Sequence, residues 1–195
     1  MHFFLLAGIV IFIAIVLILF SFTSSTASPI PYFPTNTRDM KKIIDLMDLK
    51  NDEVMIDFGA GDGGIIFRAA QRAYQHNQNT KFVAVEINTM LCFIMNLRRI
   101  FHLNRKNIYI VKHDMFVLDY PALIASLHLE KKPKLLFYLY ISPWFMPQIG
   151  EMIKCLGYQS RAITYFYPIA GVKESRKYTF TNAVYSYNHL GNETQ

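Results

Sequence analysis

The sequence predicts an α/β fold in which a mostly parallel sheet carries helices on both faces. Between residues 37 and 167, short apolar runs typical of strands alternate with amphipathic stretches typical of helices. The first of these strands, 53–58, ends in a glycine-rich turn that opens a helix. Residues 177–188 alternate in polarity, which predicts a closing antiparallel hairpin. Parallel strands joined in this way are expected to have right-handed connections.

The individual elements follow a proline-rich arm, residues 29–35, whose prolines exclude a helix. A helix is expected to begin at Thr37, because the apolar side chains that follow recur at helical spacing. The other predicted elements are strand 53–58, a helix ending near 76, strand 82–86, helix 88–102, strand 107–111, a short helix from Pro121, strand 134–141, helix 145–155, strand 161–167 and the hairpin.

The N-terminal segment, residues 3–20, contains no charged or polar side chain. As a helix, residues 3–22 would extend about 30 Å, enough to cross a hydrocarbon core. We therefore predict a transmembrane anchor at 1–23, a proline-rich linker at 24–36 and one domain at 37–195. A cleaved signal peptide with its cut near 25–27 is the alternative, although the apolar run is long and no Lys or Arg precedes it.

The charges that flank this segment predict its orientation. Arg38, Lys41 and Lys42 follow it and none precedes it, which places the domain on the cytoplasmic side by the positive-inside rule. The whole chain of 195 residues has a net charge of +6, and a basic domain held at a membrane is attracted to anionic lipid by about 1 kcal/mol per well-placed Lys or Arg. No aromatic-basic pattern indicates a nucleic-acid partner.

Cysteine usage predicts neither a disulfide nor a metal site. Cys92 and Cys155 are isolated in expected helices and lack metal-ligand spacing. We expect both to be buried, as small apolar side chains usually are.

The glycine-rich turn, residues 57–64, satisfies two cofactor-binding patterns at once. Gly59, Gly61 and Gly64 match the dinucleotide pattern, whereas Asp57, Gly59, Gly61 and Gly63 match that of S-adenosylmethionine (SAM) sites. A dinucleotide brings a pyrophosphate, which acids at the turn would repel. Here Asp57 and Asp62 flank the turn. The sulfonium and ammonium groups of SAM are attracted by carboxylates, so SAM is the favoured cofactor.

Two further acids follow the second and third predicted strands. Glu86 ends the second strand, where an acid in such folds hydrogen-bonds the ribose hydroxyls of a nucleoside. Asp114 follows the third strand, where its carboxylate would accept a hydrogen bond from the adenine amine. Each acid alone is more often a helix cap or a solvated loop residue. Three acids at the carboxyl ends of three successive strands favour a ligand site.

Several motifs together resemble a known family. The apolar segment, the arm 31–35, the turn 57–63, residues 85–88 and residues 140–147 are similar to small membrane-anchored class I SAM-dependent protein lysine methyltransferases. Animal members of this family act on the ATP synthase c subunit and the adenine nucleotide carrier. The resemblance implies a Rossmann-like fold, SAM as cofactor with S-adenosylhomocysteine as product, SAM binding by Asp57, Gly59, Gly61 and Glu86, and an arm close to the active site.

Methyl transfer to an amine depends mainly on alignment, and a lysine loses its proton more readily in a desolvated aromatic channel. The hydroxyls of Tyr32 and Tyr140 are the candidate catalytic groups that orient the nitrogen. Candidate substrate contacts are Pro31, Thr35, Ser142 and Trp144. Packing of the arm against the sheet is the favoured role for Trp144 and for Phe33.

The sequence therefore predicts a membrane-anchored methyltransferase that modifies lysine on a protein substrate, itself expected to be membrane-embedded. Methylation of a lipid or small hydrophobic molecule is an alternative, because an anchor suits it equally. A SAM-binding adaptor without activity is another, since family members usually carry a basic residue where this chain has Gly64. Methylation of nucleic-acid bases is disfavoured, because residues 140–142 lack the Asn of the Asn-Pro-Pro-Tyr type motif.

Overall fold

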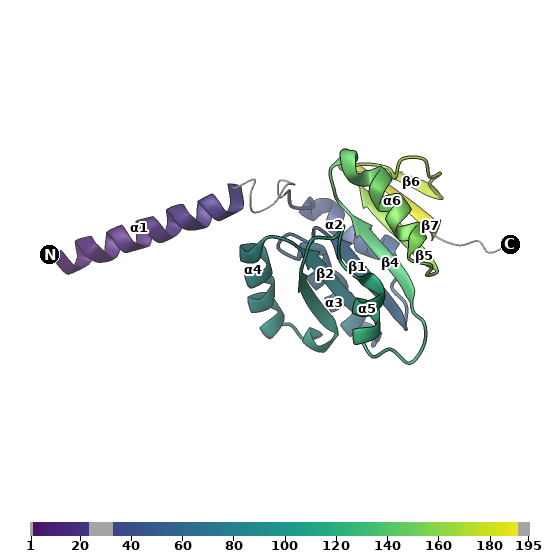
Figure 1. Ribbon diagram of the computed structural model, residues 1–195, viewed down its shortest axis with the longest axis horizontal. Coiled ribbons are helices and arrows are strands. Elements are labelled where there is room, and N and C mark those ends of the chain that lie inside the picture. Colours follow the sequence, from purple (N-terminus) through teal and green to yellow (C-terminus); the bar gives the residue numbers. More distant parts are fainter. Residues whose placement is uncertain (1, 24–32, 191–195) are drawn as a thin grey trace.

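The computed structural model describes residues 2–23 and 33–190, and within these ranges it contains a seven-stranded mixed sheet (Figure 1). The strand order is β3-β2-β1-β4-β5-β7-β6. The strands are β1 Glu53–Phe58, β2 Lys81–Glu86, β3 Ile108–Lys112, β4 Lys134–Leu139, β5 Ser160–Tyr165, β6 Arg176–Thr179 and β7 Ala183–Leu190. β1 to β5 pair in parallel, and β7 is antiparallel to β5 and β6. The predicted parallel sheet with a closing hairpin is confirmed.

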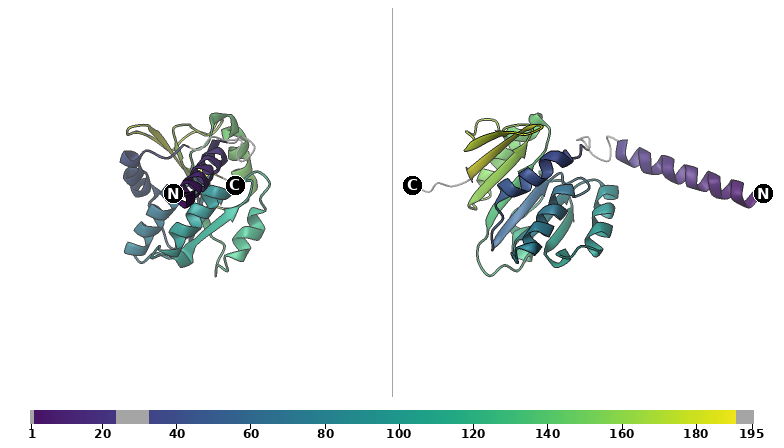
Figure 2. Two further views of the ribbon diagram at one scale, coloured as in Figure 1. Left: turned by 90° about the vertical axis from the view of Figure 1, so that its left-hand side faces the viewer. Right: turned by 180° about the vertical axis from the view of Figure 1, so that it is seen from behind.

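Helices cover both faces of the sheet (Figure 2). The helices of the domain are α2 Thr37–Met47, α3 Gly64–Gln75, α4 Thr89–Ile100, α5 Tyr120–Ser126 and α6 Met146–Cys155, with short 3-10 turns at Arg105–Asn107 and Pro143–Phe145. One buried cluster joins α2, α3 and α4 to the sheet, and the other joins α5 and α6. Alternate strand residues serve the two clusters: Met55 faces the first, while Val54 and Ile56 face the second.

Some predicted boundaries shift for local reasons. α4 begins at Thr89 because Asn88 is its N-cap, with Oδ1 accepting hydrogen bonds from the N–H groups of Met90 and Leu91. β5 ends at Tyr165, two residues earlier than predicted, because Phe166 has a φ of 78° and leaves the strand conformation. β4 likewise ends at Leu139.

The N-terminal segment forms helix α1, His2–Thr23, which extends away from the domain (Figure 1). Its exposed side chains include Phe4, Val10 and Phe12. A search of the residues that the structure describes finds no helix with both the length and the hydropathy needed to cross a membrane. The alternative cleavage point at 25–27 and most of the predicted linker lie outside the described residues.

A buried carboxylate, which the sequence analysis missed, joins α2 to the turn between β6 and β7. Asp39 has no exposed surface, and its oxygens accept hydrogen bonds from the Tyr165 hydroxyl at 2.9 Å and from the N–H groups of Thr181 and Asn182 at 2.9 and 3.0 Å. Burial alone would raise the pKa of Asp39, but these hydrogen bonds outweigh it and lower the pKa. The start of α2 is therefore fixed to the hairpin.

The expectation for the cysteines holds at one position only. Cys92 lies on the buried side of α4, and burial raises the pKa of its thiol to about 11. Cys155 is exposed, so its predicted burial is wrong. It ends α6 beside the exposed Lys154, while Ile153 of the same turn is the residue that packs into the core.

Candidate active site

The glycine-rich turn connects β1 to α3 in a conformation that glycine adopts without strain. Gly59, Gly61 and Gly63 have φ angles of 67°, 60° and 77°. A Cβ added at Gly63 would lie 2.7 Å from the ring of Phe67, so close packing also excludes a side chain there. The N–H of Gly59 donates to the carbonyl of Val85 at 2.9 Å, which attaches the turn to the end of β2.

Glu86 ends β2 and holds the turn from the other side. Its Oε2 accepts a hydrogen bond from the N–H of Gly61 at 2.9 Å, and its Oε1 accepts one from the N–H of Asn88 at 2.8 Å. Burial raises the pKa of this carboxyl, although these hydrogen bonds oppose the shift. A carboxylate has about four acceptor positions, so Glu86 retains the capacity to accept from two hydroxyls.

Asp57 is the next-to-last residue of β1, between its sheet neighbours Ala84 and Tyr138. It is 3% exposed, and no hydrogen bond or ion pair to its side chain occurs within the described ranges 2–23 and 33–190. Burial raises its pKa well above the ordinary value, and the nearby carboxylates of Glu86 and Asp62 raise it further. A buried acid in this setting favours a cationic neighbour.

Asp62 already has partners within the protein. Its Oδ1 accepts from the N–H of Gly64 at 3.0 Å, and its Oδ2 pairs with the guanidinium of Arg98 at 2.8 Å. The same guanidinium lies 4.6 Å from the centroid of the Phe67 ring. Asp62 therefore lies beside the turn, as predicted, and there it ties α3 to α4.

Asp114 follows β3 at the same edge of the sheet and is partly buried. Its Oδ1 accepts a hydrogen bond from the N–H of Phe116 at 2.9 Å, which closes a tight turn. Asp57, Glu86 and Asp114 thus follow or end three neighbouring strands, as the sequence predicts.

The proline-rich arm reaches this edge through Thr35. The Thr35 hydroxyl lies 2.9 Å from the hydroxyl of Tyr138, which is buried in β4 beside Asp57. Pro31 and Tyr32, predicted to contact substrate and to assist catalysis, lie outside the described residues. Phe33 is 66% exposed, so its predicted packing against the sheet is wrong.

Tyr140, directly after β4, belongs to an aromatic group with Tyr165 and Phe166. The Tyr140 ring meets Tyr165 edge-on at 4.9 Å between centroids and stacks with Phe166 at 6.2 Å. Burial raises the pKa of Tyr140. Phe166 was missed by sequence reasoning, because a positive φ on a phenylalanine leaves no signature in the sequence.

Two other predicted substrate contacts follow Tyr140. Ser142 is partly buried, and its carbonyl accepts from the N–H of Phe145 in the 3-10 turn. Trp144 is 81% exposed, so the packing role favoured for it is wrong. Trp144 lies in the 3-10 turn Pro143–Phe145, which a proline begins. An exposed indole remains available to a partner.

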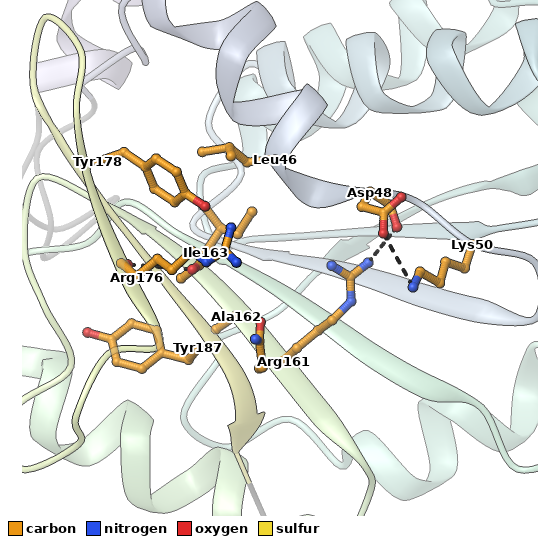
Figure 3. A pocket seen from close by; sticks show the side chains of 11 residues that line it. Leu46, Asp48, Lys50, Arg161, Ala162, Ile163, Arg176, Tyr178 and Tyr187 are labelled. Atoms are coloured by element: carbon orange, nitrogen blue, oxygen red, sulfur yellow. Dashed lines mark hydrogen bonds and ion pairs between the residues drawn. The ribbon is translucent and has the colours of Figure 1, made fainter.

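A cavity of about 440 Å³ lies elsewhere, over β5, β7 and β6 near the end of α2 (Figure 3). Arg161 lines it and forms a two-pronged ion pair with the buried Glu53, both contacts at 2.8 Å. Asp48 and Lys50 pair beside it at 3.3 Å. No predicted site residue lines this cavity. Among the residues that the structure places, no group of three or more His, Cys, Asp and Glu side chains is arranged to hold a metal ion.

The strand order, the antiparallel β7 and the acids at the carboxyl edge define a Rossmann-like class I methyltransferase fold. No family model matches the sequence, and no curated protein matches it. The similar solved structures include an RNA methyltransferase from Salinibacter ruber in complex with S-adenosylhomocysteine, with a TM-score of 0.65 and 18% identity over 84% of this chain and 97% of that one.

Two further solved structures share the fold. One is a precorrin-6y C5,15-methyltransferase from Geobacter metallireducens, with a TM-score of 0.53 and 15% identity over 82% of this chain and 90% of that one. The other is a SAM-dependent O-methyltransferase from Thermotoga maritima, with a TM-score of 0.53 and 16% identity over 84% of this chain and 69% of that one. At these identities the likeness is one of fold.

Proposed function

We propose that this chain is a SAM-dependent methyltransferase that methylates a lysine amine of a membrane-associated protein. One observation carries the proposal: Asp57, the glycine-rich turn and Glu86 converge at the carboxyl edge of a sheet with methyltransferase topology. Ligands of open α/β sheets bind at that edge. SAM and its product S-adenosylhomocysteine are the cofactor pair that this arrangement suits best.

The charge of the site supports SAM over a dinucleotide. Asp57 is buried without a cationic partner in the described part of the chain, and Glu86 and Asp62 add negative charge beside it. A sulfonium or ammonium group would offset this charge, whereas a pyrophosphate would add to it. The spare acceptor positions on Glu86 suit the two ribose hydroxyls of a nucleoside.

The reaction requires an uncharged amine placed in line with a transferable methyl group. Bound SAM supplies that methyl on its sulfonium sulfur; the nitrogen–carbon bond forms as the carbon–sulfur bond breaks. The protein's contribution is alignment, which can lower the barrier by about 7 to 11 kcal/mol. Tyr140 and Phe166, which pack on the buried Tyr165, offer an apolar surface beside the site, where a lysine amine would lose its proton more readily.

The membrane location of the substrate is supported by the N-terminal segment and by the arm. Residues 3–20 are apolar throughout, and α1 exposes Phe4, Val10 and Phe12. The arm that follows is tied at Thr35 to Tyr138, the neighbour of Asp57 in the sheet. An acceptor lysine near a membrane surface would therefore meet the site close to the point where the chain enters the domain.

The test is incubation of the full chain, in membranes from its own source, with methyl-labelled SAM. We expect label in a protein band, recovered as methyl-lysine after hydrolysis. Asp57→Ala should abolish it. The matched control is Asp45→Ala, which changes an acid on α2 that pairs with Arg72 instead of facing the turn, and its labelling should equal that of the unaltered chain.

Other outcomes would redirect the assignment. Label recovered in the organic phase would assign lipid methylation. Measurable SAM binding without label in any acceptor would support a non-catalytic adaptor. If the folded chain did not bind SAM, the proposal that it is a SAM-dependent methyltransferase would be wrong.

A further inference from the structure

Helix α4 exposes an apolar face that the fold itself does not use. Its inner side is buried through Leu91, Cys92 and Met95. Its outer side and the turn that follows it, residues 101–103, carry five large apolar residues that are 45 to 85% exposed. These residues, hereafter the outer α4 face, are Phe93, Leu97, Ile100, Phe101 and Leu103. A contiguous apolar surface of this kind marks a contact with a partner or a membrane.

The segment that contains the outer α4 face is strongly basic. Between Glu86 and Asp114 the sequence has no acidic residue, and it has five basic ones: Arg98, Arg99, Arg105, Lys106 and Lys112. Asp62 neutralises Arg98. Among the residues that the structure describes, the guanidinium groups of Arg99 and Arg105 donate to the neutral carbonyls of Ile108 and Ile100, so their charge is retained close to the apolar side chains.

The position of α4 matches a surface that faces a membrane. In Figures 1 and 2, α4 is the element of the domain on the side toward which α1 extends, and its axis runs across the direction of α1. The two helices also contact each other. A membrane surface that meets the domain on the side of α1 would therefore lie parallel to α4.

We infer that the outer α4 face docks on an anionic bilayer surface. This inference rests on the membrane location in the proposed function and adds the surface of the domain that meets the lipid. The apolar side chains enter the boundary between head groups and acyl chains, while Arg99, Arg105 and Lys106 meet anionic head groups. A second copy of the chain is disfavoured as occupant, because a symmetric contact would bring the same basic segments together.

Docking through α4 would also orient the active site. The helix begins at Thr89, three residues after Glu86, so its first turn lies at the carboxyl edge of the sheet. Contact along α4 holds this edge at a fixed height above the lipid. The acceptor would then be a lysine at the membrane surface rather than one on a distant soluble domain.

The test measures the lipid exposure of single labelled positions in the full chain. Cys155→Ser removes the exposed thiol, and Cys92 is buried. An environment-sensitive fluorophore is attached at Leu97→Cys, or at Thr179→Cys on β6, which is exposed at the opposite edge of the sheet. The chain is reconstituted in vesicles of phosphatidylcholine with or without phosphatidylserine, containing acyl-chain quencher lipid.

We expect a blue shift and strong quenching at position 97 in phosphatidylserine vesicles, and neither at position 179. Lys106→Glu, which changes an exposed residue, should weaken docking by at least about fivefold, as expected for loss of one basic residue at a lipid surface. Its methyl transfer to a soluble lysine peptide in detergent should remain unchanged.

Two results would overturn this inference alone. One is a chain that floats with the vesicles while the fluorophore at position 97 remains as exposed to water as the one at position 179. That result would exclude docking through α4 and leave the proposed SAM binding and methyl transfer unaffected. The other is a blue shift without quenching by lipid, which would assign the outer α4 face to protein contact. A chain that does not float with vesicles at all would refute both this inference and the proposed membrane location, while leaving SAM binding to be judged by its own assay.

Discussion

The N–H of Gly61 donates a hydrogen bond to Oε2 of Glu86 across 2.9 Å, joining the glycine-rich turn to the end of the neighbouring strand. The acid that the sequence predicts as a ribose ligand thus also supports the loop that would surround the cofactor. Its other oxygen accepts from Asn88, the N-cap of α4. One carboxylate therefore couples the turn, β2 and α4.

Glu86→Gln should weaken SAM binding by about tenfold or more, because it removes the charge and leaves one of two backbone N–H groups without an acceptor. Isothermal titration measures this. The free energy of unfolding should fall by about 1 to 3 kcal/mol. The control, Glu130→Gln, changes an exposed acid and should alter neither the SAM affinity nor the free energy of unfolding. If Glu86→Gln bound SAM as tightly as the unaltered chain, Glu86 would not belong to the site.

Asp57→Asn should separate stability from function. The raised pKa of Asp57 means that ionising this carboxyl costs free energy in the folded chain when no cation is bound. Replacing it with a neutral side chain should therefore stabilise the ligand-free fold, by roughly 0.5 to 2 kcal/mol, while greatly weakening SAM binding. Thermal unfolding with and without SAM tests both effects, and a destabilised ligand-free variant would contradict the account.

SAM affinity should fall as the pH is lowered, and the fall should begin above the usual carboxyl range. Binding of a cation favours ionised Asp57 and Glu86, and the pKa of each is raised in the folded chain. The acids therefore take up protons above their ordinary values of 3.8 and 4.5. Titrations at a series of pH values measure this; an affinity constant down to pH 4.5 would argue against direct charge contact.

Asp39→Ala should destabilise the domain by about 3 kcal/mol, since it leaves Tyr165, Thr181 and Asn182 without their shared acceptor. The pKa of Asp39 is lowered, so its stabilising contribution is complete above the ordinary value of 3.8 and is lost as the pH falls through the lower folded value. Chemical unfolding measures the free energy of unfolding of the unaltered chain and of Asp39→Ala. The difference between the two should be smaller at pH 3 than at pH 7.

Thr35→Val should slow methyl transfer more than it weakens SAM binding. It removes the partner of the buried Tyr138 hydroxyl and releases the arm from β4, at a cost of about 1 kcal/mol in the free energy of unfolding. Steady-state kinetics measures the effect on methyl transfer. The control is Thr37→Val, which changes an exposed threonine two residues further along the chain. Unchanged kcat would show that the arm has no part in positioning the acceptor.

Sequence periodicity was sufficient for most of the fold, because each strand and helix is apolar on the side or sides that it buries. β1 was predicted to the residue, and the acids near the carboxyl ends of β1, β2 and β3 were predicted at one edge, since parallel strands end on the same side of a sheet. Errors arose where the backbone leaves its regular conformation. Phe166 follows β5 with a positive φ, and Trp144 is exposed in a 3-10 turn.

The sequence by itself determined the α/β topology, the glycine-rich turn and the acids beside it, because these depend on local periodicity and on the conformational freedom of glycine. Only the tertiary structure decided which polar groups meet across long separations, as Asp39 does with Tyr165 and Thr35 with Tyr138. It also decided that one side of α4 is left uncovered. These contacts depend on the packing of whole elements against one another, which no single stretch of sequence encodes.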